Sequence, residues 1–269
     1  MTHPCLSVVN NKMKVATFNV NSIRARMPIL LDWLSASKPD VVCVQETKVV
    51  DEDFPFIEIK GAGYDAAFRG EKSYNGVAIL SRGELKDVSF GLDDGGQPDE
   101  ARLIRATYNG VHIINTYVPQ GRDAKLAVYQ YKLEWFARLA KLIARHYTTR
   151  QKVLWCGDLN VAPADIDVHD PKRLLGHVCF NPEVQAAFQG VVDWGFIDVF
   201  RKHHPEPGCY TFYDYRAPSA LKAGKGWRID HILATKPLAA KSADCTIDLG
   251  PRKRPKPSDH APLVATFDV

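Results

Sequence analysis

The sequence predicts a single α/β domain in which helices cover mixed sheets, and three features of the chain indicate this fold class. Short apolar runs rich in β-branched residues recur from end to end, as in strands buried within sheets. Segments with apolar residues at helical spacing lie between them. Across 269 residues, no linker-like stretch of Pro, Gly and Ser divides the chain. We therefore expect one domain over residues 13–269, preceded by an N-terminal extension of residues 1–12.

Eight segments are predicted to be strands because each is a short, apolar, β-branched run. They span residues 15–20, 41–45, 76–81, 103–108, 111–118, 153–156, 229–234 and 263–269. Asn109-Gly110 joins two of these runs and is typical of a tight hairpin. Antiparallel pairs are therefore expected alongside parallel ones.

Three segments are predicted to be helices: residues 28–36, 125–146 and 182–192. Pro28 would occupy the first turn of the first helix, where proline is well tolerated. Tyr129, Phe136 and Ile143 stand at helical spacing in the second helix and predict an apolar stripe that faces a sheet. Asn181 is the predicted N-cap of the third helix.

The composition is ordinary for a globular protein and argues against several classes. No apolar run approaches the ~20 residues that span a bilayer, and the N-terminus lacks the pattern of a signal peptide. The net charge of +4 permits a polyanionic partner without requiring one. Cys43 and Cys156 lie in strand-like runs, which indicates buried thiols in a reducing compartment. We expect a cytoplasmic monomer without membrane contact.

Polar residues end several predicted strands, and each has a structural as well as a functional interpretation. Asn19 could bind a metal ion or cap the next helix. Glu46 directly follows a buried run, where an unpaired carboxylate is costly. A metal ion or the cation of Lys48 would offset that cost, and the alternative is a surface ion pair.

Two further strand ends carry groups suited to a phosphate or a metal ion. Tyr117 could donate its hydroxyl to a phosphate, and Gln120 and Arg122 follow in the same loop. Asp158 and Asn160 stand two residues apart and suit a hard metal ion or a phosphate oxygen. The structural alternatives are an aromatic-proline packing turn and a Gly-Asp turn with an Asn cap.

Asp230 lies within an apolar run, and Asp259-His260 lies close to the C-terminus. An embedded Asp commonly orients a histidine, so we expect Asp230 to pair with His260, and Arg228 is the alternative partner. If one sheet edge collects all these strand ends, the crowded carboxylates require a divalent cation. Oxygen ligands with one histidine and no cysteine indicate Mg²⁺, or Mn²⁺, and thus a metal-dependent phosphoester hydrolase.

At these positions the chain resembles the exonuclease III-type DNA repair nucleases of the endonuclease/exonuclease/phosphatase superfamily. The matching motifs span residues 18–24, 45–48, 74–78, 117–121, 157–160, 214–216, 227–230 and 258–262. The resemblance implies a four-layered αββα sandwich of the deoxyribonuclease I-like kind. It also implies Mg²⁺-dependent hydrolysis of double-stranded DNA: 3′-to-5′ exonuclease action, removal of blocked 3′ termini as a 3′-phosphatase or phosphodiesterase, and incision at abasic sites as an AP endonuclease.

The resemblance also implies a set of metal ligands. They are Asn19, Glu46, Asp158, Asn160, Asp259 and His260. Asn19, Glu46 and Asp259 would surround the principal ion. Asp158 and Asn160 would lie on the far side of the scissile phosphate, around a second ion if two are bound.

Catalytic roles follow from the same resemblance. The residues concerned are Tyr117, Asp158, Asn160, Asp230 and His260. Tyr117 would contact the phosphate, and Asp230 would select the tautomer of His260. His260 would hold the phosphate or help to deprotonate the attacking water, and Asp158 would orient that water or protonate the departing 3′-oxygen.

The expected DNA-contacting residues are Tyr117, Gln120, Arg122, His177, Phe212, Arg216, Trp227 and Arg228. Phe212 departs from the family pattern, because relatives usually carry tryptophan there, in the pocket for an extruded abasic sugar. His177 lies in a loop on the DNA side and would obstruct that sugar while leaving a 3′ end free to dock. We therefore expect AP endonuclease activity to be weaker than 3′-end processing; a solvated loop histidine is the alternative.

Further basic residues are expected to track DNA phosphates. They are Arg69, Lys72, Lys222, Lys225 and the run of residues 252–256. Three other functions stay open on the sequence. The chain could be mainly an AP endonuclease, a superfamily phosphoesterase with an inositol-phosphate or lipid-headgroup substrate, or a DNA-binding module without activity.

Overall fold

The computed structural model describes residues 12–96, 100–217 and 219–269, and over these ranges its strands form two six-stranded sheets. The elements are β1 (Lys12–Asn19), α1 (Ile23–Ser37), β2 (Val41–Gln45), α2 (Phe56–Gly61), β3 (Asp65–Arg69), β4 (Val77–Ser81), β5 (Lys86–Phe90), β6 (Leu103–Tyr108), β7 (Val111–Tyr117), α3 (Ala127–His146), β8 (Val153–Asp158), α4 (Pro171–Leu174), α5 (Pro182–Val192), β9 (Phe196–Asp198), α6 (Val199–His203), β10 (Asp230–Thr235), α7 (Lys236–Ala239), β11 (Ser242–Ile247) and β12 (Leu263–Asp268). Short 3₁₀ turns lie at Asp51–Asp53, Asp165–Asp167 and Pro251–Lys253.

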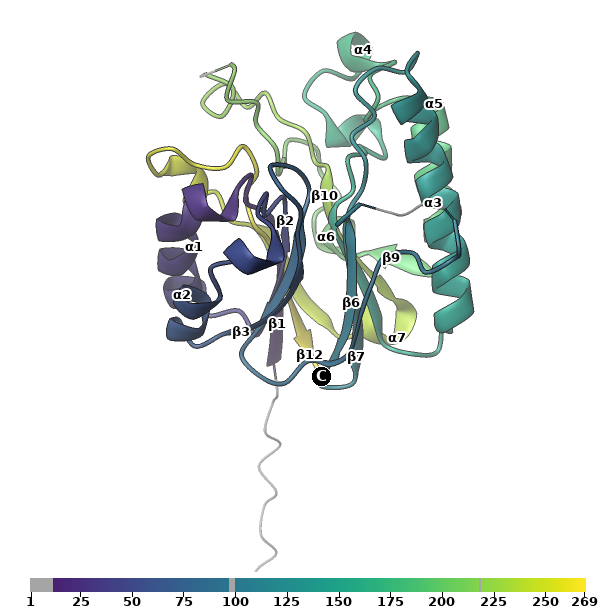
Figure 1. Ribbon diagram of the computed structural model, residues 1–269. Helices are drawn as coiled ribbons and strands as arrows, with labels where there is room; N and C mark the ends of the chain where they lie inside the picture. Colours follow the sequence, from purple (N-terminus) through teal and green to yellow (C-terminus); the bar gives the residue numbers. More distant parts are fainter. Residues whose placement is uncertain (1–11, 97–99, 218) are drawn as a thin grey trace, which may run out of the picture.

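The two sheets pack face to face, with α1 and α2 outside one and α3 and α5 outside the other (Figure 1). Their strand orders are β11-β12-β1-β2-β4-β3 and β5-β6-β7-β8-β10-β9. This arrangement is the expected αββα sandwich with mixed sheets, so the predicted fold class is confirmed. Of the expected N-terminal extension, residues 1–11 lie outside the described residues, and Lys12 already belongs to β1.

Strand alternation distributes the apolar side chains between the inner layer and the two outer layers. Val15 and Cys43 of one sheet pack against Cys156 of the other. The alternate residue Val44 faces α1, and Trp155 faces α3. Cys43 and Cys156 are buried free thiols, as predicted.

All eight predicted strands are present; β2 and β6 have the predicted bounds, and the other six have shifted ends. The hairpin between β6 and β7 is also confirmed, and Asn109 and Gly110 take φ angles of 47° and 75°. The strands that the sequence did not predict are β3, β5, β9 and β11. Over the described residues, these are the outermost strands of the two sheets. An edge strand buries less of its surface, so its apolar pattern is weak.

The predicted helices over α3 and α5 are confirmed, but the predicted start of α1 is wrong. This helix begins at Ile23, and Pro28 lies in its interior. Ser22 is the N-cap, and its Oγ accepts a hydrogen bond from the backbone N–H of Ala25 (3.4 Å). Pro28 removes one internal hydrogen bond, and the packing of the helix on the sheet compensates. In the described part of the chain, no helix combines the length and the apolarity of a membrane span.

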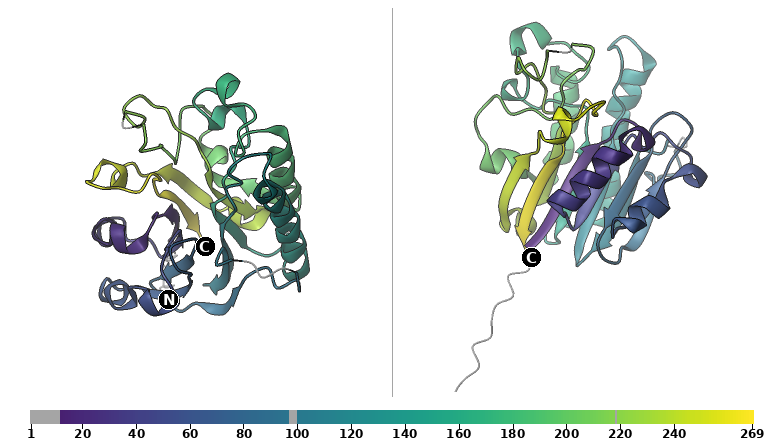
Figure 2. Two further views of the ribbon diagram at one scale, coloured as in Figure 1. Left: turned by 45° about the horizontal axis from the view of Figure 1, so that its top comes forward. Right: turned by 90° about the vertical axis from the view of Figure 1, so that its left-hand side faces the viewer.

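The sheet topology brings distant segments to one end of the sandwich. β1 pairs in parallel with β2, and β7 pairs in parallel with β8. β12 runs antiparallel to β1, and β10 runs antiparallel to β8. The carboxyl ends of β1, β2, β7 and β8 therefore lie at the same end of the sandwich as the amino ends of β10 and β12. Figures 1 and 2 show the C-terminus at the opposite end of the sandwich.

Candidate active site

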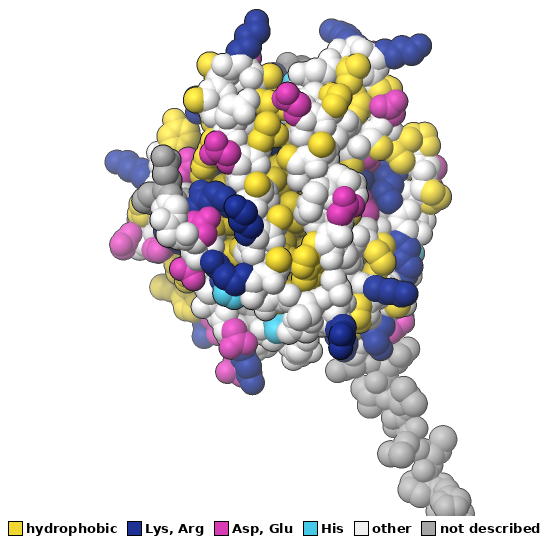
Figure 3. All heavy atoms as spheres, turned by 90° about the vertical axis from the view of Figure 1, so that its right-hand side faces the viewer, with side chains coloured by type: hydrophobic (Ala, Val, Ile, Leu, Met, Phe, Trp, Pro, Cys, Tyr) yellow, Lys and Arg dark blue, Asp and Glu magenta, His cyan; other side chains and the backbone are white. Residues whose placement is uncertain are grey.

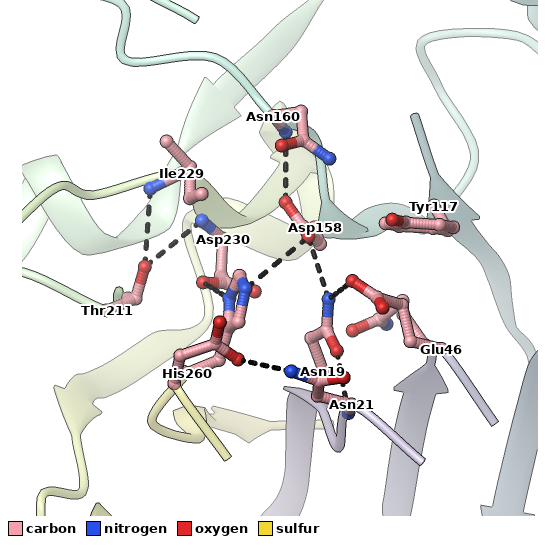
Figure 4. A network of polar contacts seen from close by, with 12 residues as sticks. Asn19, Asn21, Glu46, Tyr117, Asp158, Asn160, Thr211, Ile229, Asp230 and His260 are labelled. Carbon is pink, nitrogen blue, oxygen red and sulfur yellow. Dashed lines mark hydrogen bonds and ion pairs between the residues drawn. The ribbon is translucent and has the colours of Figure 1, made fainter. Parts of the chain in front are cut away.

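Asn19 connects the two sheets at the centre of this end. Its Nδ2 donates to Glu46 Oε1 (2.7 Å) and to Asp158 Oδ2 (2.8 Å), as Figure 4 shows. Its Oδ1 accepts from the backbone N–H of Asn21 (2.9 Å). The structure thus brings Asn19, Glu46 and Asp158 together. In this geometry Asn19 bridges the two carboxylates, and its expected part as a metal ligand stays a prediction.

A lysine ammonium lies beside Glu46. Lys48 Nζ is 2.7 Å from Glu46 Oε2 and donates to Asn21 Oδ1 (2.6 Å), and Asn21 Nδ2 donates to Asp259 Oδ1 (3.0 Å). Burial alone would raise the pKa of Glu46, but Lys48 and then Asn19 lower it. Asn21, Glu46 and Lys48 have φ angles of 45°, 52° and 55°. Such strained backbone persists only where the surroundings hold it, which is common at functional sites.

Asp158 ends β8 and is buried. Its Oδ1 accepts from the backbone N–H of Asn160 (3.1 Å), and Asn160 Nδ2 donates to the carbonyl of Val118 (3.0 Å). Gly157 precedes it with a φ of +142°, and a Cβ there would lie 1.8 Å from the carbonyl oxygen of Thr116. Glycine is therefore required here by the close approach of β7.

Asp230 and His260 form the expected hydrogen-bonded pair, thirty residues apart in sequence. His260 Nδ1 lies 2.8 Å from Asp230 Oδ2, and His260 Nε2 lies 3.7 Å from Asp158 Oδ2. Thr211 Oγ1 accepts from the backbone N–H groups of Ile229 (3.3 Å) and Asp230 (3.2 Å). These bonds hold the start of β10, so the orientation of the imidazole is set from two directions.

Burial and crowding shift the pKa values of this group. Burial raises the pKa of Asp158, and the negative charges of Asp230 and Glu46 raise it further. His260 opposes this shift, and the resulting pKa is about 7. Burial would lower the pKa of His260, but Asp230 and Asp158 raise it to about 10. Asp158 and His260 each influence the charge of the other, so the protonation of one depends on that of the other.

Tyr117 ends β7, and its hydroxyl points toward the same group (Figure 4). Burial raises its pKa well above 10, and Glu46 and Asp158 add to the shift. The hydroxyl therefore keeps its proton and can act as a donor. The guanidinium of Arg102 lies 4.9 Å from the centre of the ring and holds it in place.

A cavity of about 270 Å³ opens beside these side chains. The ring of His177 lies 4.7 Å from that of Trp227, and its Nδ1 accepts from the backbone N–H of Cys179 (3.1 Å). The ring of Phe212 lies 5.0 Å from that of His260. Other lining residues are Gln120, Asn160, Asp214, Arg216, Ile229 and Asp259. Both residues expected to influence substrate choice, His177 and Phe212, therefore line the cavity.

The donor atoms fit a hard divalent cation. Glu46, Asp158 and His260 each offer one ligand atom, and these atoms lie within 4.8 Å of one another. Burial first, and then the negative charges of Asp230 and Glu46, raise the pKa of Asp158, and a bound cation would stabilise its charged form. Carboxylate oxygens with one imidazole suit Mg²⁺ or Mn²⁺.

Arg228 was expected to contact DNA, and this prediction is wrong. The side chain is buried, with its Nε 2.6 Å from Asp167 Oδ1 and its Nη1 2.8 Å from Asp198 Oδ2. Its Nη1 also lies 2.9 Å from Nδ1 of His231. It is therefore part of a buried ion cluster, and it is not the partner of Asp230. Asp167 and Asp198 lie too far away in sequence for a local pattern to reveal them.

Arg252, the first cation of the basic run, is also buried. It donates to the carbonyl of Tyr213 (3.2 Å) and to the carbonyl of Ser258. Its expected contact with phosphate is therefore wrong; it supports the loop that precedes Asp259. Lys253, Arg254 and Lys256 are exposed, and for them DNA contact stays a prediction.

The remaining expected DNA contacts differ in position. Arg216 lines the cavity, while Arg122 is exposed outside it. Figure 3 shows the face covered by α3 and α5, where basic, acidic and apolar side chains are interspersed. A mixed surface of this kind is ordinary and does not mark a polyanion-binding face.

The sequence analysis gave no functional role to Lys132, Cys179 or Asp214, although Asp214 lies in one of the matching motifs. Cys179 and Asp214 line the cavity, and Lys132 is completely buried behind it. A signal for Lys132 exists, because it stands within the apolar stripe of α3, three residues after Tyr129 and four before Phe136. A lysine at such a position is expected to be buried with its stripe.

Comparison with known proteins supplies the family. The sequence model of the Endonuclease/Exonuclease/phosphatase family matches residues 16–260 of this chain. The chain belongs to this family. Exodeoxyribonuclease III of Haemophilus influenzae is 34% identical to it over 267 residues, which cover 95% of this chain and 100% of that protein. DNA repair nuclease APEX1 of Danio rerio is 30% identical over 264 residues, covering 96% of this chain and 83% of that protein.

Two solved structures share the whole fold. An AP endonuclease from Archaeoglobus fulgidus has 52% sequence identity and a TM-score of 0.94, and the match covers 96% of this chain and 100% of that one. The 3′ phosphatase NExo from Neisseria, bound to a product DNA hairpin, has 38% identity and a TM-score of 0.92, with the same coverage. These similarities confirm the resemblance to exonuclease III-type nucleases, and the chain is an enzyme of this family.

Proposed function

We propose that the chain is a Mg²⁺-dependent DNA repair nuclease that acts mainly at the 3′ ends of double-stranded DNA, as a cytoplasmic monomer. It would remove nucleotides in the 3′-to-5′ direction and clear blocked 3′ termini, with weaker incision at abasic sites. The names of its relatives, an exodeoxyribonuclease III and a 3′ phosphatase, support DNA as the substrate. The observation that carries the preference for 3′ ends is the position of His177 in the cavity wall, against Trp227.

The side chains of the site suit hydrolysis of a phosphodiester. Asp230 engages Nδ1 of His260, which leaves Nε2 free to donate to a phosphate oxygen. The protonated hydroxyl of Tyr117 can donate to the same phosphate. Asp158 lies between these donors and Asn19, where it can orient the attacking water or pass a proton to the departing 3′-oxygen.

Glu46 and Asp158, two of the three residues whose ligand atoms lie within 4.8 Å of one another, would hold the cation, and Asp259 lines the same cavity. His260, the third, would contribute only as a neutral imidazole, because a protonated Nε2 has no lone pair for a metal ion. When bound, Mg²⁺ stabilises the negative charge that develops on the phosphate in an in-line displacement. Cleavage of a duplex with a recessed 3′ end should therefore stop in EDTA and return when Mg²⁺ or Mn²⁺ is added back. Cleavage that continues in EDTA would contradict a metal-dependent site.

The preference for 3′ ends is tested with three duplexes: one with a recessed 3′ end, one with a 3′-phosphate and one with an abasic analogue. His177→Gly should raise incision relative to trimming by about tenfold or more, because it removes a ring from the cavity wall. Leu175→Gly is the matched control, since Leu175 lies in the same loop, is exposed and does not line the cavity. An unchanged ratio in His177→Gly would sink the proposed role of His177.

A second candidate function is AP endonuclease as the main activity. It is favoured by the 52% identity with the Archaeoglobus fulgidus protein, which is described as an AP endonuclease. The same three duplexes decide between the two, because this candidate requires the wild-type protein to incise the abasic analogue faster than it trims the recessed end. DNA binding without cleavage of any duplex in Mg²⁺ would instead indicate an inactive binding module.

A further inference from the structure

Lys132 lies on α3 behind the cavity and has 0% of its surface exposed. Its Nζ donates to three backbone carbonyls: those of Asn160 (2.7 Å), Val178 (2.7 Å) and Gln120 (3.1 Å). An ammonium has three N–H donors, so these three acceptors satisfy it completely. Burial lowers the pKa of Lys132, while Cys179 and Asp158 oppose that shift. A buried cation is costly, so its retention here depends on all three acceptors being in place.

The three acceptors belong to three different loops of the site. They lie 12, 28 and 46 residues from Lys132 in the sequence. The loop of Gln120 follows the strand that ends at Tyr117, and the loop of Asn160 follows the strand that ends at Asp158. Val178 lies directly after His177. Gln120, Asn160 and His177 line the cavity, and Lys132 binds a backbone carbonyl in the loop of each of them.

These loops reach the reacting groups through short connections. The backbone N–H of Asn160 donates to Asp158 Oδ1 (3.1 Å), so the carbonyl held by Lys132 and the amide that holds Asp158 belong to one residue. The carbonyl of Val178 precedes Cys179, whose N–H donates to the ring of His177 (3.1 Å). A shift of either loop would move Asp158 or His177 with it.

We propose that Lys132 is a positioning residue: its buried ammonium joins three loops of the cavity and thereby sets the positions of Asp158, Asn160 and His177. Lys132 itself is shielded from substrate by these loops. The inference rests on the proposed function only for the choice of substrate in its test. Since a displacement of about 1 Å in a reacting group can lower a rate about 100-fold, a clamp of this kind acts on kcat.

The test is Lys132→Met, which keeps a long unbranched side chain and removes all three donors. For the duplex with a recessed 3′ end in Mg²⁺, kcat should fall about 100-fold while KM changes less than about threefold. KM is expected to hold because DNA affinity depends mainly on phosphate contacts outside the cavity. Lys141→Met is the matched control, because Lys141 is exposed on the same helix. Thermal melting of each variant gives the temperature range in which it is folded.

A merely structural role predicts a different result: a lower melting temperature, with kcat of the folded protein within about twofold of wild type. That outcome would overturn the proposal. Lys132→Arg provides a second test if Lys132→Met does not fold. It keeps the charge and the donors, but a planar guanidinium cannot direct three N–H groups at three converging carbonyls as an ammonium does.

Lys132→Arg should therefore melt within a few degrees of wild type and lose about tenfold in kcat. A value of kcat within about twofold of wild type would contradict the proposal whether or not Lys132→Met folds. If the proposed function is wrong, the wild-type protein will cleave none of the three duplexes, and this result differs from an effect of Lys132. Normal wild-type cleavage together with unaffected Lys132 variants would contradict only the role of Lys132.

Discussion

Lys132 and Arg228 are both buried cations in the same half of the sandwich, but their partners differ. Arg228 faces the carboxylates of Asp167 and Asp198, whereas Lys132 faces three neutral backbone carbonyls. Removing Arg228 would leave Asp167 with Arg201 as its remaining arginine and the partly exposed Asp198 beside His231. Removing Lys132 would leave three loops without a common donor. We therefore expect a buried cation paired with carboxylates to act mainly on stability, and one bound to loop carbonyls to act mainly on the geometry of a site.

The largest effect on stability is expected from Arg228→Met. Loss of one partner from a buried ion cluster typically costs about 3–5 kcal/mol, because the remaining charges are uncompensated. Urea unfolding at neutral pH measures this loss, and the folded variant should keep more of its kcat than Lys132→Met does. Arg216→Met is the control, since Arg216 pairs with Asp214 at the surface, with 84% of its side chain exposed. A loss below about 1 kcal/mol for Arg228→Met would erase the distinction between the two cations.

Acid should weaken the Arg228 cluster in particular. Burial would raise the pKa of Asp198, but Arg228 and then His231 lower it well below its usual range. The folded-state pKa thus lies below the unfolded value of about 3.9, so the stabilisation is complete above that value and is lost as the pH falls below about 4. Asp198→Asn should therefore lose about 1–3 kcal/mol at pH 7 and show a flatter decline in stability below pH 4. Urea unfolding midpoints measured between pH 7 and pH 3 give both the loss at pH 7 and the slope below pH 4. Asp32→Asn is the control, because Asp32 is the exposed partner of Arg254, and this variant should behave like wild type.

The smallest effect on stability is expected from an exposed cation. Arg254 forms a surface ion pair with Asp32, and 54% of its side chain is exposed. Arg254→Ala should change the free energy of unfolding by less than about 1 kcal/mol. If Arg254 contacts a DNA phosphate, the same variant should reduce the salt dependence of binding by about one unit of slope. Titrations with a duplex in EDTA at several salt concentrations measure the slope. An unchanged slope would show that Arg254 does not contact a DNA phosphate.

The fold was predictable wherever strands are buried in the interior of a sheet. β2, β4 and β8 each begin with a continuous apolar run because both of their faces are covered. The outermost strands β3, β5, β9 and β11 were missed, since most of their residues are partly covered or exposed and form no apolar run. The start of α1 was missed for a related reason: Pro28 was taken as a first-turn residue, while packing of Ile23 and Trp33 on the sheet extends the helix on both sides of it.

The candidate site was predictable as a set of residue types but not as a geometry. Strand-end Asn, Asp, Glu and His residues indicated an oxygen-rich site, and the pairing of Asp230 with His260 was expected from the need of an embedded carboxylate for a partner. Cations were harder to interpret, because a lysine or arginine in sequence looks the same whether it meets DNA, a buried carboxylate or a backbone carbonyl. Arg228 and Arg252 were wrongly expected to contact DNA, and Lys132 was given no role.

The sequence by itself determined the αββα fold class, the family and the chemical types of the site residues, because strand periodicity and local motifs are properties of neighbouring residues. Only the tertiary structure decided which side chains meet. Asn19 bridges Glu46 and Asp158 across two sheets, and Lys132 joins three loops, through contacts between residues 12 to 139 positions apart. Contacts at such separations depend on how sheets and helices pack, and no local pattern of residues records them.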